Sequence, residues 1–439
     1  MVITKNVDVL VVGGSVSGSM AAEVLAKGKL STMLIEKEKT PRTKACSGIQ
    51  FPYFEKLLGK TIPKDVLSQN QMTKTVIHIP EEEPSVETRK DMYKRTGVTW
   101  WKRMAYNIMD KQVSKMSPIK TDMSMYNFMR NTFDDWMNKE AITSGAEFHD
   151  QHELVSFVQN QDTTFTSTIK NKKDSTTLTV NSKYLIAADG PLSTIRRQMH
   201  PEHFTTDSDK KGGAMNYYFS ANPNKDGIKV DEHALYQVYD ANFNSDMFAW
   251  IYQKGVDRVN TKETGFPLWV VGTTFDNAQY KDHAEKFVNW ACKTYNVGCE
   301  GVAKAHPSSE NWALDVATLT PKDRFFFGDK NLLVVGDAAG LIDAYRGLGM
   351  DSAALSAQYA AKCILDQPND AIACYTKKMM PITTPMGKKT SNSKHFFANN
   401  TALRFHVIDR FVLSGEGKKM VKCIGKNQKE NDSDKMQLC

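Results

Sequence analysis

A glycine turn between two apolar strands near the N-terminus constrains the fold of this chain more than any other feature. Val7–Val12 is a short apolar run that predicts a buried parallel strand, and Gly13–Gly18 (GGSVSG) follows it directly. Ser19–Ala26 is rich in good helix formers, and Thr32–Ile35 predicts a second strand that ends in Glu36. A strand, glycine turn, helix and strand with an acid about twenty residues past the turn is the pattern of a dinucleotide-binding βαβ unit.

The residues of this turn have physical reasons to be there. Gly13 permits the tight turn, Gly18 lets the helix pack closely on the strand, and the amides at the helix start point toward a pyrophosphate. Glu36 can accept hydrogen bonds from both hydroxyls of an adenosine ribose, which favours an unphosphorylated ribose. Ser15 stands where the fingerprint has its middle glycine. The alternative is an ordinary βαβ unit, which would need no acid after the second strand.

Two later segments also consist of an apolar strand followed by a turn. Tyr184–Ala188 runs into Asp189–Arg196 (DGPLSTIR), and Asn331–Val335 runs into Gly336–Gly340 (GDAAG). A helix is expected over Gly349–Asp366. Each segment alone would indicate only a strand that ends in a turn, but their combination and order are far more specific.

The series GGSVSG, Glu36, DGPLSTIR and GDAAG resembles the FAD-binding fold of the p-hydroxybenzoate hydroxylase-like flavoproteins. The resemblance implies an α/β fold, in which a Rossmann-type FAD-binding domain is interleaved with an antiparallel-sheet substrate domain and followed by a C-terminal helical region. It implies FAD as the cofactor, with Asp337 on a ribityl hydroxyl and with Asp189 and Gly190 holding the nucleotide. Met125–Ala146 resembles the superfamily's helix with an arginine before a Phe-Asp pair, so Arg130 is expected to contact FAD; the alternative is a solvated helix charge.

Within that superfamily, Lys44–Ile49 (KACSGI) resembles the K-x-C-G/S-G-L/I segment of the geranylgeranyl reductases, flavoenzymes that saturate isoprenoid chains. The family's cysteine loop lies close to the isoalloxazine ring, so Cys46 is expected to orient the alkene or supply a proton. Packing as a small hydrophobe is the alternative. Phe248–Gly255 looks like the family's aromatic Y-x-W-x-F-P stretch, and Val335–Met350 follows its GDAAG…G-x-G pattern. Gln253 and Ala344 stand where the family usually has proline, and these departures bear on the substrate more than on the cofactor.

The resemblance implies an FAD-dependent reductase of carbon–carbon double bonds in geranylgeranyl or related isoprenoid lipid chains. A hydride from flavin N5 must be matched by a proton, which calls for a dry, aromatic-walled site with a proton donor. The expected donors are Cys46, Tyr252 and Tyr345, and the expected substrate contacts are Phe248, Trp250 and Tyr252. The expected FAD contacts are Gly13, Gly14, Ser15, Ser17, Gly18, Glu36, Lys37, Lys44, Ala45, Cys46, Arg130, Asp189, Gly190, Gly336, Asp337, Gly347, Leu348, Gly349 and Met350.

Two other functions stay open at this point. One is a flavin-dependent monooxygenase or halogenase on the same scaffold, because Phe248–Tyr252 faintly echoes the halogenases' W-x-W-x-I-P. The other is a flavin-bearing lipid carrier or sensor without catalysis. No second Rossmann fingerprint follows the first, so the electron donor of a reductase is expected to be external: NAD(P)H, ferredoxin or another reductant.

The expected partners follow from charge and composition. The net charge of +7 permits attraction to anionic lipid but does not by itself indicate nucleic acid, which is not expected. Arg89–Arg103 mixes six basic residues with Tyr93, Trp100 and Trp101, which suits the membrane interface, and a solvated basic loop is the alternative. No signal peptide or membrane span is expected. Seven scattered cysteines without CxxC or zinc spacing predict no metal and favour reduced thiols in a cytoplasmic protein, with a peripheral membrane contact.

The expected domains are discontinuous. Residues 1–65, 120–200 and 325–366 should form the FAD-binding domain, and residues 66–119 and 201–324 the substrate domain. The substrate domain should contain strands at 234–239, 248–252 and 268–275 and a helix at 282–295. Residues 367–425 should be helical, and the polar tail 426–439 should be frayed or disordered.

Overall fold

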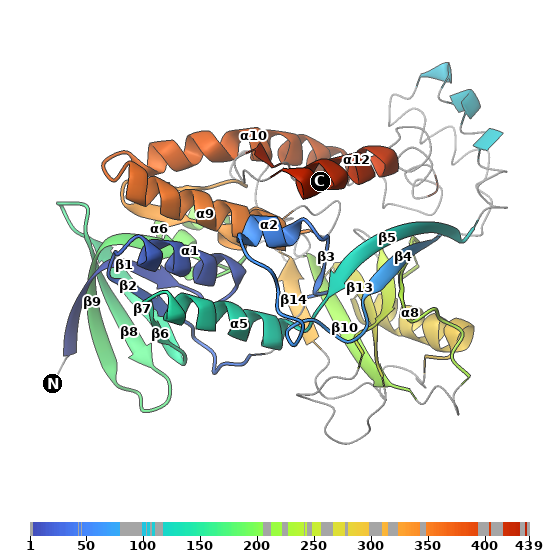
Figure 1. The fold of residues 1–439 in the computed structure, drawn as a ribbon, viewed down its shortest axis with the longest axis horizontal. Helices are drawn as coiled ribbons and strands as arrows, with labels where there is room; N and C mark the ends of the chain where they lie inside the picture. The colour runs from blue at the N-terminus through green and yellow to red at the C-terminus, as the bar shows by residue number, and fades with distance from the viewer. Residues whose placement is uncertain are drawn as a thin grey trace.

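The computed structural model describes residues 3–42, 44, 46–79, 99–101, 103–105, 108–109, 117–204, 212–221, 227–240, 242–243, 248–255, 267–276, 280–297, 310–314, 324–342, 348–393, 404, 416–430 and 435–436. These residues form two sheets that lie side by side, with helices above and in front of the first sheet and further helices at the C-terminus (Figure 1).

The first sheet is built on parallel strands in the order β15-β16-β9-β1-β2-β6. Its strands are β1 (Ile3–Val12), β2 (Thr32–Ile35), β6 (Glu147–His149), β9 (Thr177–Ala187), β15 (Gly328–Asp329) and β16 (Leu332–Val334). Along this order, all neighbours are parallel except β15 with β16. The central strands carry continuous buried apolar residues, such as Val9–Val12, because helices cover a parallel sheet on its faces.

The long strand β9 is shared between two neighbours. Its first half pairs with β8 (Phe165–Asn171), which forms an antiparallel hairpin with β7 (His152–Gln159). Its second half pairs in parallel with β16. The ends of β1, β9 and β16 therefore lie at one edge of the sheet, where the three glycine-containing turns follow.

Helix α1 (Val16–Lys27) packs between α5 (Arg130–Thr143) and α9 (Met350–Asp366) (Figure 1). Short elements complete this part of the chain: α2 (Phe54–Leu58), α6 (Thr194–Met199), and the 3₁₀ turns η1 (Pro201–His203) and η4 (Gly336–Ala339). Helix α9 is almost wholly buried, which its small residues allow.

The second sheet has the order β14-β10-β13-β12-β11-β4-β5-β3. Its strands are β3 (Ile49–Gln50), β4 (Met72–His78), β5 (Ile119–Asn127), β10 (Gly212–Ser220), β11 (Ala234–Val238), β12 (Ala249–Gln253), β13 (Leu268–Asp276) and β14 (Glu310–Leu314). The neighbours are antiparallel except β11 with β4. Helix α8 (Tyr280–Tyr295) packs on β13, and its Phe287 and Val288 belong to a separate apolar core with Trp269.

The C-terminal region contains α10 (Ala371–Ser393) and α12 (Glu416–Lys429). A disulfide between Cys363 and Cys374 joins α9 to α10, with 5.8 Å between the Cα atoms. Cys292 and Cys423 each take part in a disulfide as well. The expectation of reduced thiols is therefore wrong for these cysteines. The cysteines of the Cys363–Cys374 pair are eleven residues apart on two different helices, so a short-range motif could not reveal them.

The predicted fold class is confirmed: an α/β first sheet, a mainly antiparallel second sheet and a helical C-terminal region. The domain boundaries stay a prediction, although β3 and β5 join the second sheet from segments assigned mostly to the first domain. Helix α12 continues to Lys429, four residues into the tail that was expected to fray. Among the described residues, no helix is long and apolar enough to span a bilayer.

Candidate functional site

The turn after β1 brings three backbones into close contact. Gly13 has φ +113°, and a Cβ at this position would overlap the Ala188 carbonyl at the end of β9. A Cβ on Gly18 would overlap the Gly13 carbonyl oxygen, so this position in the first turn of α1 accepts only glycine. The turn is thus a cradle of main-chain atoms at the N-terminus of α1, where the helix dipole favours an anion.

Positive side chains surround the start of α1. Arg130 is 5% exposed and donates to both carboxylate oxygens of Asp134 at 2.8 and 2.9 Å, and to the Ser15 hydroxyl at 2.8 Å. Lys44 also donates to the Ser15 hydroxyl, at 3.2 Å, and Ser15 donates to Asp134 at 3.1 Å. The sequence left a solvated charge as the alternative for Arg130, and burial excludes it.

Burial and the contacts among Asp134, Arg130 and Lys44 shift the pKa of each of these side chains. Burial opposes the charge of Asp134, but Arg130 and then Arg42 outweigh it and hold the pKa of Asp134 below its ordinary value. Burial likewise opposes the charge of Arg130, and its ion pair with Asp134 nevertheless raises its pKa. Burial, followed by the charge of Arg130, lowers the pKa of Lys44. In their ion pairs and nearest contacts, the three cations Arg130, Arg42 and Lys44 face two carboxylates, Asp134 and Glu36, and this balance leaves room for a further anion such as a pyrophosphate.

Glu36 lies at the end of β2 as expected, and it is buried. Its carboxylate accepts from the Gly14 amide at 2.9 Å and the Glu38 amide at 3.0 Å, and it pairs with Arg42 at 3.2 Å. Its neighbour Lys37 is exposed. Glu36 therefore also holds the glycine turn, and its predicted contact with a ribose stays a prediction.

The second motif is tied to the third by a buried arginine. Asp189 accepts from the amides of Thr194 and Ile195 at 2.8 and 3.2 Å, which starts α6. Arg196, in α6, donates to the carbonyls of Arg324 and Ala338 at 3.1 and 3.0 Å. The DGPLSTIR segment thereby fixes the GDAAG turn.

One oxygen of Asp189 is a buried acceptor that has no hydrogen-bond partner in the structure. Burial raises the pKa of this carboxyl above its ordinary value, although Ser193 and nearby amides act the other way. A buried carboxylate oxygen without a partner is costly, and a hydroxyl or amide of a bound nucleotide would satisfy it. Together with the Gly13 cradle and the cations at Ser15, this oxygen fits FAD.

The third motif, the GDAAG turn, lies beside the start of α9, which in turn contacts Cys46. Gly336 has φ +59° in the η4 turn, where a Cβ would lie 2.8 Å from the Ser17 hydroxyl. A Cβ on Gly349 would lie 3.3 Å from a carboxylate oxygen of Asp337. Met350 begins α9, and its sulfur is 3.8 Å from the sulfur of Cys46.

The loop Cys46–Gly48, called here the cysteine loop, is held by the second sheet. The Cys46 carbonyl accepts from Asn216 of β10 at 3.4 Å, and the Ser47 carbonyl accepts from the Tyr252 hydroxyl at 3.2 Å and from Lys254. The Gly48 carbonyl accepts from the Phe128 amide at 2.9 Å. Cys46 itself is half-buried and is the free cysteine among the described residues. Its sulfur accepts from the Gly48 amide at 3.4 Å.

Lys254 is the buried cation of this contact. Its ammonium group is bound to the Ser47 carbonyl, to the Asn127 side chain at 2.9 Å and to the Phe128 carbonyl at 2.7 Å. Gly48 has φ +58°, and a Cβ there would overlap the Phe128 carbonyl and lie 2.8 Å from the ammonium nitrogen. Lys254 therefore binds the cysteine loop to β5 at the end of β12.

The aromatic stretch predicted to contact substrate is buried. Phe248, Trp250 and Tyr252 are each less than a tenth exposed, and the Trp250 indole donates to Asn216 at 2.8 Å. Trp250 lies directly over Gly272, where any side chain would clash. Asn216 thus connects Trp250 to the Cys46 carbonyl. The structure brings the aromatic stretch and the cysteine loop together, whereas the substrate role of these residues stays a prediction.

Some predicted residues lie outside the described part of the chain, namely Ala45, Tyr345 and Gly347. Leu348, also a predicted FAD contact, is half-buried. The sequence interpretation missed Asp134, Arg42, Lys254, Asn127 and Asn216 as members of the site. The spacing of Arg130 and Asp134 on a helix could have indicated an ion pair, and Lys254 directly follows the aromatic stretch. The two asparagines carry no sequence signal.

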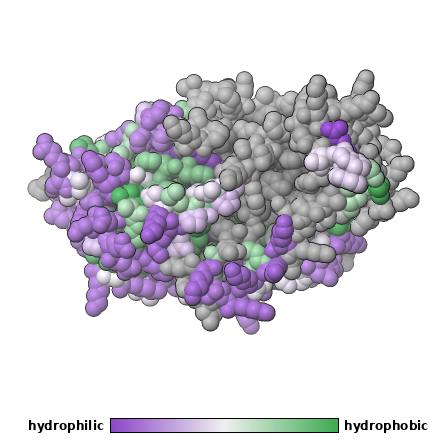
Figure 2. Space-filling model, turned by 90° about the horizontal axis from the view of Figure 1, so that it is seen from above, coloured by the Kyte–Doolittle hydropathy of each residue, from purple (hydrophilic) through white to green (hydrophobic). Residues whose placement is uncertain are grey.

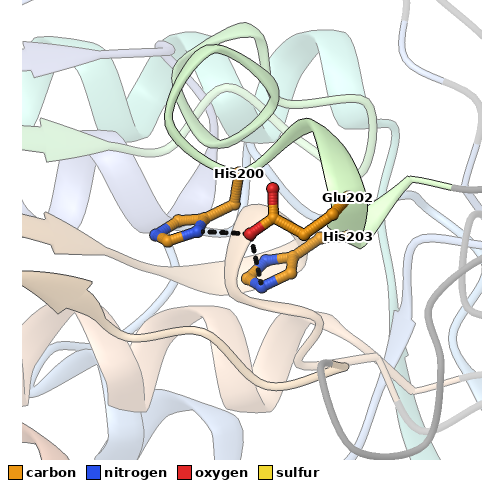
Figure 3. Close-up of side chains that lie close together, drawn as sticks. All are labelled: His200, Glu202 and His203. Carbon is orange, nitrogen blue, oxygen red and sulfur yellow. Dashed lines mark hydrogen bonds and ion pairs between the residues drawn. The ribbon is translucent and has the colours of Figure 1, made fainter.

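A further cluster of ionisable side chains lies beyond α6 (Figure 3). Ligand atoms of His200, Glu202 and His203 lie within 4.8 Å of one another, with Glu202 2.9 Å from Nδ1 of His200 and 3.9 Å from Nε2 of His203. Arg196 donates to Nδ1 of His203 at 3.3 Å, so a neutral His203 carries its proton on Nε2, toward Glu202. A metal needs that nitrogen unprotonated, and the arginine therefore opposes coordination.

The rings of His200 and His203 stack at 4.6 Å and meet Phe326 edge-on. The cluster thus packs α6 and η1 against the segment before β15.

A nucleotide cradle on a parallel sheet, joined by a cysteine loop to a mainly antiparallel sheet, is the arrangement of a flavoprotein oxidoreductase. The chain belongs to the FAD-binding domain family, because residues 6–367 match it. Its cofactor is FAD, and its turns, cations and Asp189 are the residues that would hold it.

Known proteins agree with this assignment. The chain is 26% identical to digeranylgeranylglycerophospholipid reductase 2 of Methanosphaera stadtmanae over 353 residues, which cover 80% of this chain and 76% of that protein. Its fold is similar to that of a geranylgeranyl bacteriochlorophyll reductase-like protein from Thermoplasma acidophilum, with TM-score 0.71, 18% identity and coverage of 92% and 91% of the two chains. It is also similar to a variant of the halogenase PltM in complex with FAD, with TM-score 0.60, 15% identity and coverage of 97% and 84%.

Proposed function

We propose that this oxidoreductase saturates carbon–carbon double bonds of geranylgeranyl or related isoprenoid lipid chains. The observation that carries the proposal is the position of the cysteine loop. It touches the start of α9 through Met350 and is bound to the second sheet through Asn216, Tyr252 and Lys254. The reductase named among the relatives supports the same chemistry.

Reduced FAD, when bound, supplies a hydride to one alkene carbon, and the protein must supply the proton and the environment. An alkene offers only apolar surface, so the residues that face it should be aromatic and dry. Phe248 and Trp250 are proposed as that wall. Burial of the stretch excludes water that would compete for the developing charge.

Cys46 is proposed as the proton donor, since its sulfur lies at the meeting point of the two sheets and the start of α9. Tyr252 is the second candidate, but its hydroxyl already donates to the Ser47 carbonyl, which favours a positioning role. Tyr345 remains a sequence candidate. The proposed electron donor is external: NAD(P)H, ferredoxin or another reductant.

The alternative is a monooxygenase or halogenase, because the fold is also similar to that of a halogenase. Such enzymes need the reduced flavin to react with oxygen, whereas an alkene reductase needs it to react with the lipid. The sequence favours a cytoplasmic setting, but the Cys363–Cys374 disulfide weighs against a reducing compartment, because cytosolic disulfides are rare outside hyperthermophiles. The proposed setting is therefore a membrane surface, without assignment to the cytoplasm.

The test is anaerobic. The purified holoprotein is reduced chemically, excess reductant is removed, and a geranylgeranylated lipid is added while flavin absorbance is followed. The proposal predicts return of the oxidised spectrum in wild type, and retained FAD with slower return in Cys46→Ala. A flavin that stays reduced until air enters, and then yields hydrogen peroxide or an oxygenated or halogenated product, would move the assignment to the alternative.

A further inference from the structure

The connection between β4 and β5 carries a helical surface whose large apolar side chains face solvent. Residues 100–101, 103–105 and 108–109 are helical. Trp100, Trp101, Met104 and Ile108 are 56%, 65%, 48% and 58% exposed. We call these four side chains the tryptophan patch.

The members of the patch are close in sequence and lie in the three short helical stretches just named. Met109, directly after Ile108, packs against the main core. This part of the connection is thus anchored by one apolar side chain and turns four others to solvent, the reverse of an ordinary surface helix. The rings of Trp100 and Trp101 stack on each other with centroids 3.6 Å apart.

The charge around the patch is positive. Between Arg89 and Lys120 the sequence has nine basic and two acidic residues, a net charge of +7. That equals the net charge of the whole chain, so the remainder is neutral in sum, although Glu81–Glu83 and Glu87 precede the segment. Arg103, within the helix, is exposed beside the patch. Tryptophan rings flanked by cations match the headgroup region of an anionic bilayer.

The location connects the patch to the candidate site. Figure 1 shows these residues, in cyan, at the end of the molecule opposite the N-terminus, beyond β4 and β5. Seen from above, hydrophobic (green) atoms lie at this same end beside pale and hydrophilic ones (Figure 2). Strand β5 starts at Ile119, near the patch in sequence, and ends at Asn127, which binds Lys254 under the cysteine loop. A strand of this length spans about 30 Å.

We propose that the tryptophan patch docks the enzyme on the surface of an anionic lipid bilayer. The rings and Met104 and Ile108 enter the interface, while Arg103 and the neighbouring basic residues contact lipid phosphates. No described helix spans a membrane, so this contact is peripheral. That the bilayer also holds the substrate rests on the proposed function; the docking itself does not.

The experiment measures binding of the full-length holoprotein to vesicles by co-sedimentation. The vesicles are phosphatidylglycerol mixed with phosphatidylcholine, or phosphatidylcholine alone. The patch variant is Trp100→Ala with Trp101→Ala. The matched control is Val155→Ala with Val158→Ala, which removes apolar groups that are 53% and 62% exposed on β7. We expect the patch variant to bind anionic vesicles at least about tenfold more weakly and the control to bind as wild type does.

Arg103→Gln should weaken binding to anionic vesicles about fivefold and leave binding to neutral vesicles unchanged. Wild-type protein that stays in the supernatant with both vesicles, or a patch variant that binds as tightly as wild type, overturns the proposal. So does a dimer that requires Trp100 and Trp101 in the absence of vesicle binding, because the patch would then join two copies.

A separate measurement keeps this proposal distinct from the proposed function. Anaerobic alkene reduction is assayed with detergent-dispersed lipid, for which docking is unnecessary. If vesicle binding depends on the patch but no lipid is reduced in either format, the docking surface stands and the proposed reaction fails. If detergent-dispersed lipid is reduced but vesicle binding does not depend on the patch, the proposed reaction stands and the docking surface fails.

Discussion

The carboxylate of Asp134 compensates the cations around Ser15. We therefore expect its removal to lower the free energy of unfolding more than any other change in this cluster. Replacing Asp134 by Asn leaves Arg130 buried without its partner. Loss of one partner of a buried pair costs about 3–5 kcal/mol, so chemical denaturation of the apoprotein should show a decrease of that size in the free energy of unfolding. The control is Asp135→Asn, which removes only a surface pair with Lys139 and should cost about 0–1 kcal/mol.

The same pair predicts a pH dependence. Since the folded pKa of Asp134 lies below the ordinary value of 3.8, its contribution to stability is fully present above that pH and is lost as the pH falls through the folded pKa. The difference in stability between wild type and Asp134→Asn should therefore be constant above about pH 5 and shrink below about pH 4. An unchanged difference in acid would contradict the charge argument.

Lys254 should act on the reaction through the cysteine loop. Lys254→Met removes the donor to the Ser47 and Phe128 carbonyls while FAD contacts stay intact. We expect normal FAD content, a turnover reduced by up to roughly 100-fold, and an altered alkylation rate of Cys46. Lys74→Met, on the same sheet but in an exposed pair with Asp231, is the control and should change none of these. Equal turnover in both variants would make Lys254 purely structural.

At the scale of single residues, the spacing after the first strand located Gly13 and Glu36, which the structure places in one glycine turn. Arg130 came from the resemblance of its helix to the superfamily, and the contacts of all three residues with FAD stay a prediction. Lys254, Asn127 and Asn216 act through contacts across 127 to 207 residues of sequence. Such contacts exist only once two sheets have met, and no local pattern encodes them.

Among the elements, the β1–α1 turn allows the sharpest comparison. Gly13 and Gly145 have similar backbone angles, φ +113° and +101°, but a Cβ would overlap Ala188 only at Gly13 and would meet nothing at Gly145. Both alanine variants should lose about 1–3 kcal/mol from backbone strain. Only Gly13→Ala should also be purified without FAD, as flavin absorbance will show. FAD retained by Gly13→Ala would mean that the turn is not the cradle.

The α9–α10 pair gives a second prediction for elements. The disulfide closes a short segment, with Cys363 and Cys374 eleven residues apart, and closure of a loop of this size is worth about 3 kcal/mol. Cys374→Ser should lower the free energy of unfolding by that amount in oxidising buffer and by much less in reductant. Peptide mapping without reduction provides the direct check, and two free thiols there would contradict the pairing.

Strands and helices themselves were well predicted where their pattern was continuous. The four residues of β2 and the strands β11–β13 lie where alternation or apolar runs placed them, within one or two residues. The β5 strand could not be found in this way, because its first half is largely exposed and polar. It pairs instead with β4 and β3, and Asn127 at its end binds Lys254.

For the molecule as a whole, the order of motifs determined the fold class, since the three turns must meet at one end of a parallel sheet. What the sequence could not give is how the second sheet closes over that end. The cysteine loop, which belongs to neither sheet, is the joint between them. We propose that this joint places an isoprenoid alkene against reduced FAD.

The most direct measurement of that claim is the stoichiometry of one anaerobic turnover. Chemically reduced holoprotein is mixed with a geranylgeranylated lipid in excess, and the flavin oxidised is compared with the double bonds lost, measured by mass spectrometry of the lipid. We expect one double bond to be saturated for each flavin oxidised, with two hydrogens added to the lipid. An unchanged lipid mass beside a flavin that is reoxidised only by oxygen would contradict it.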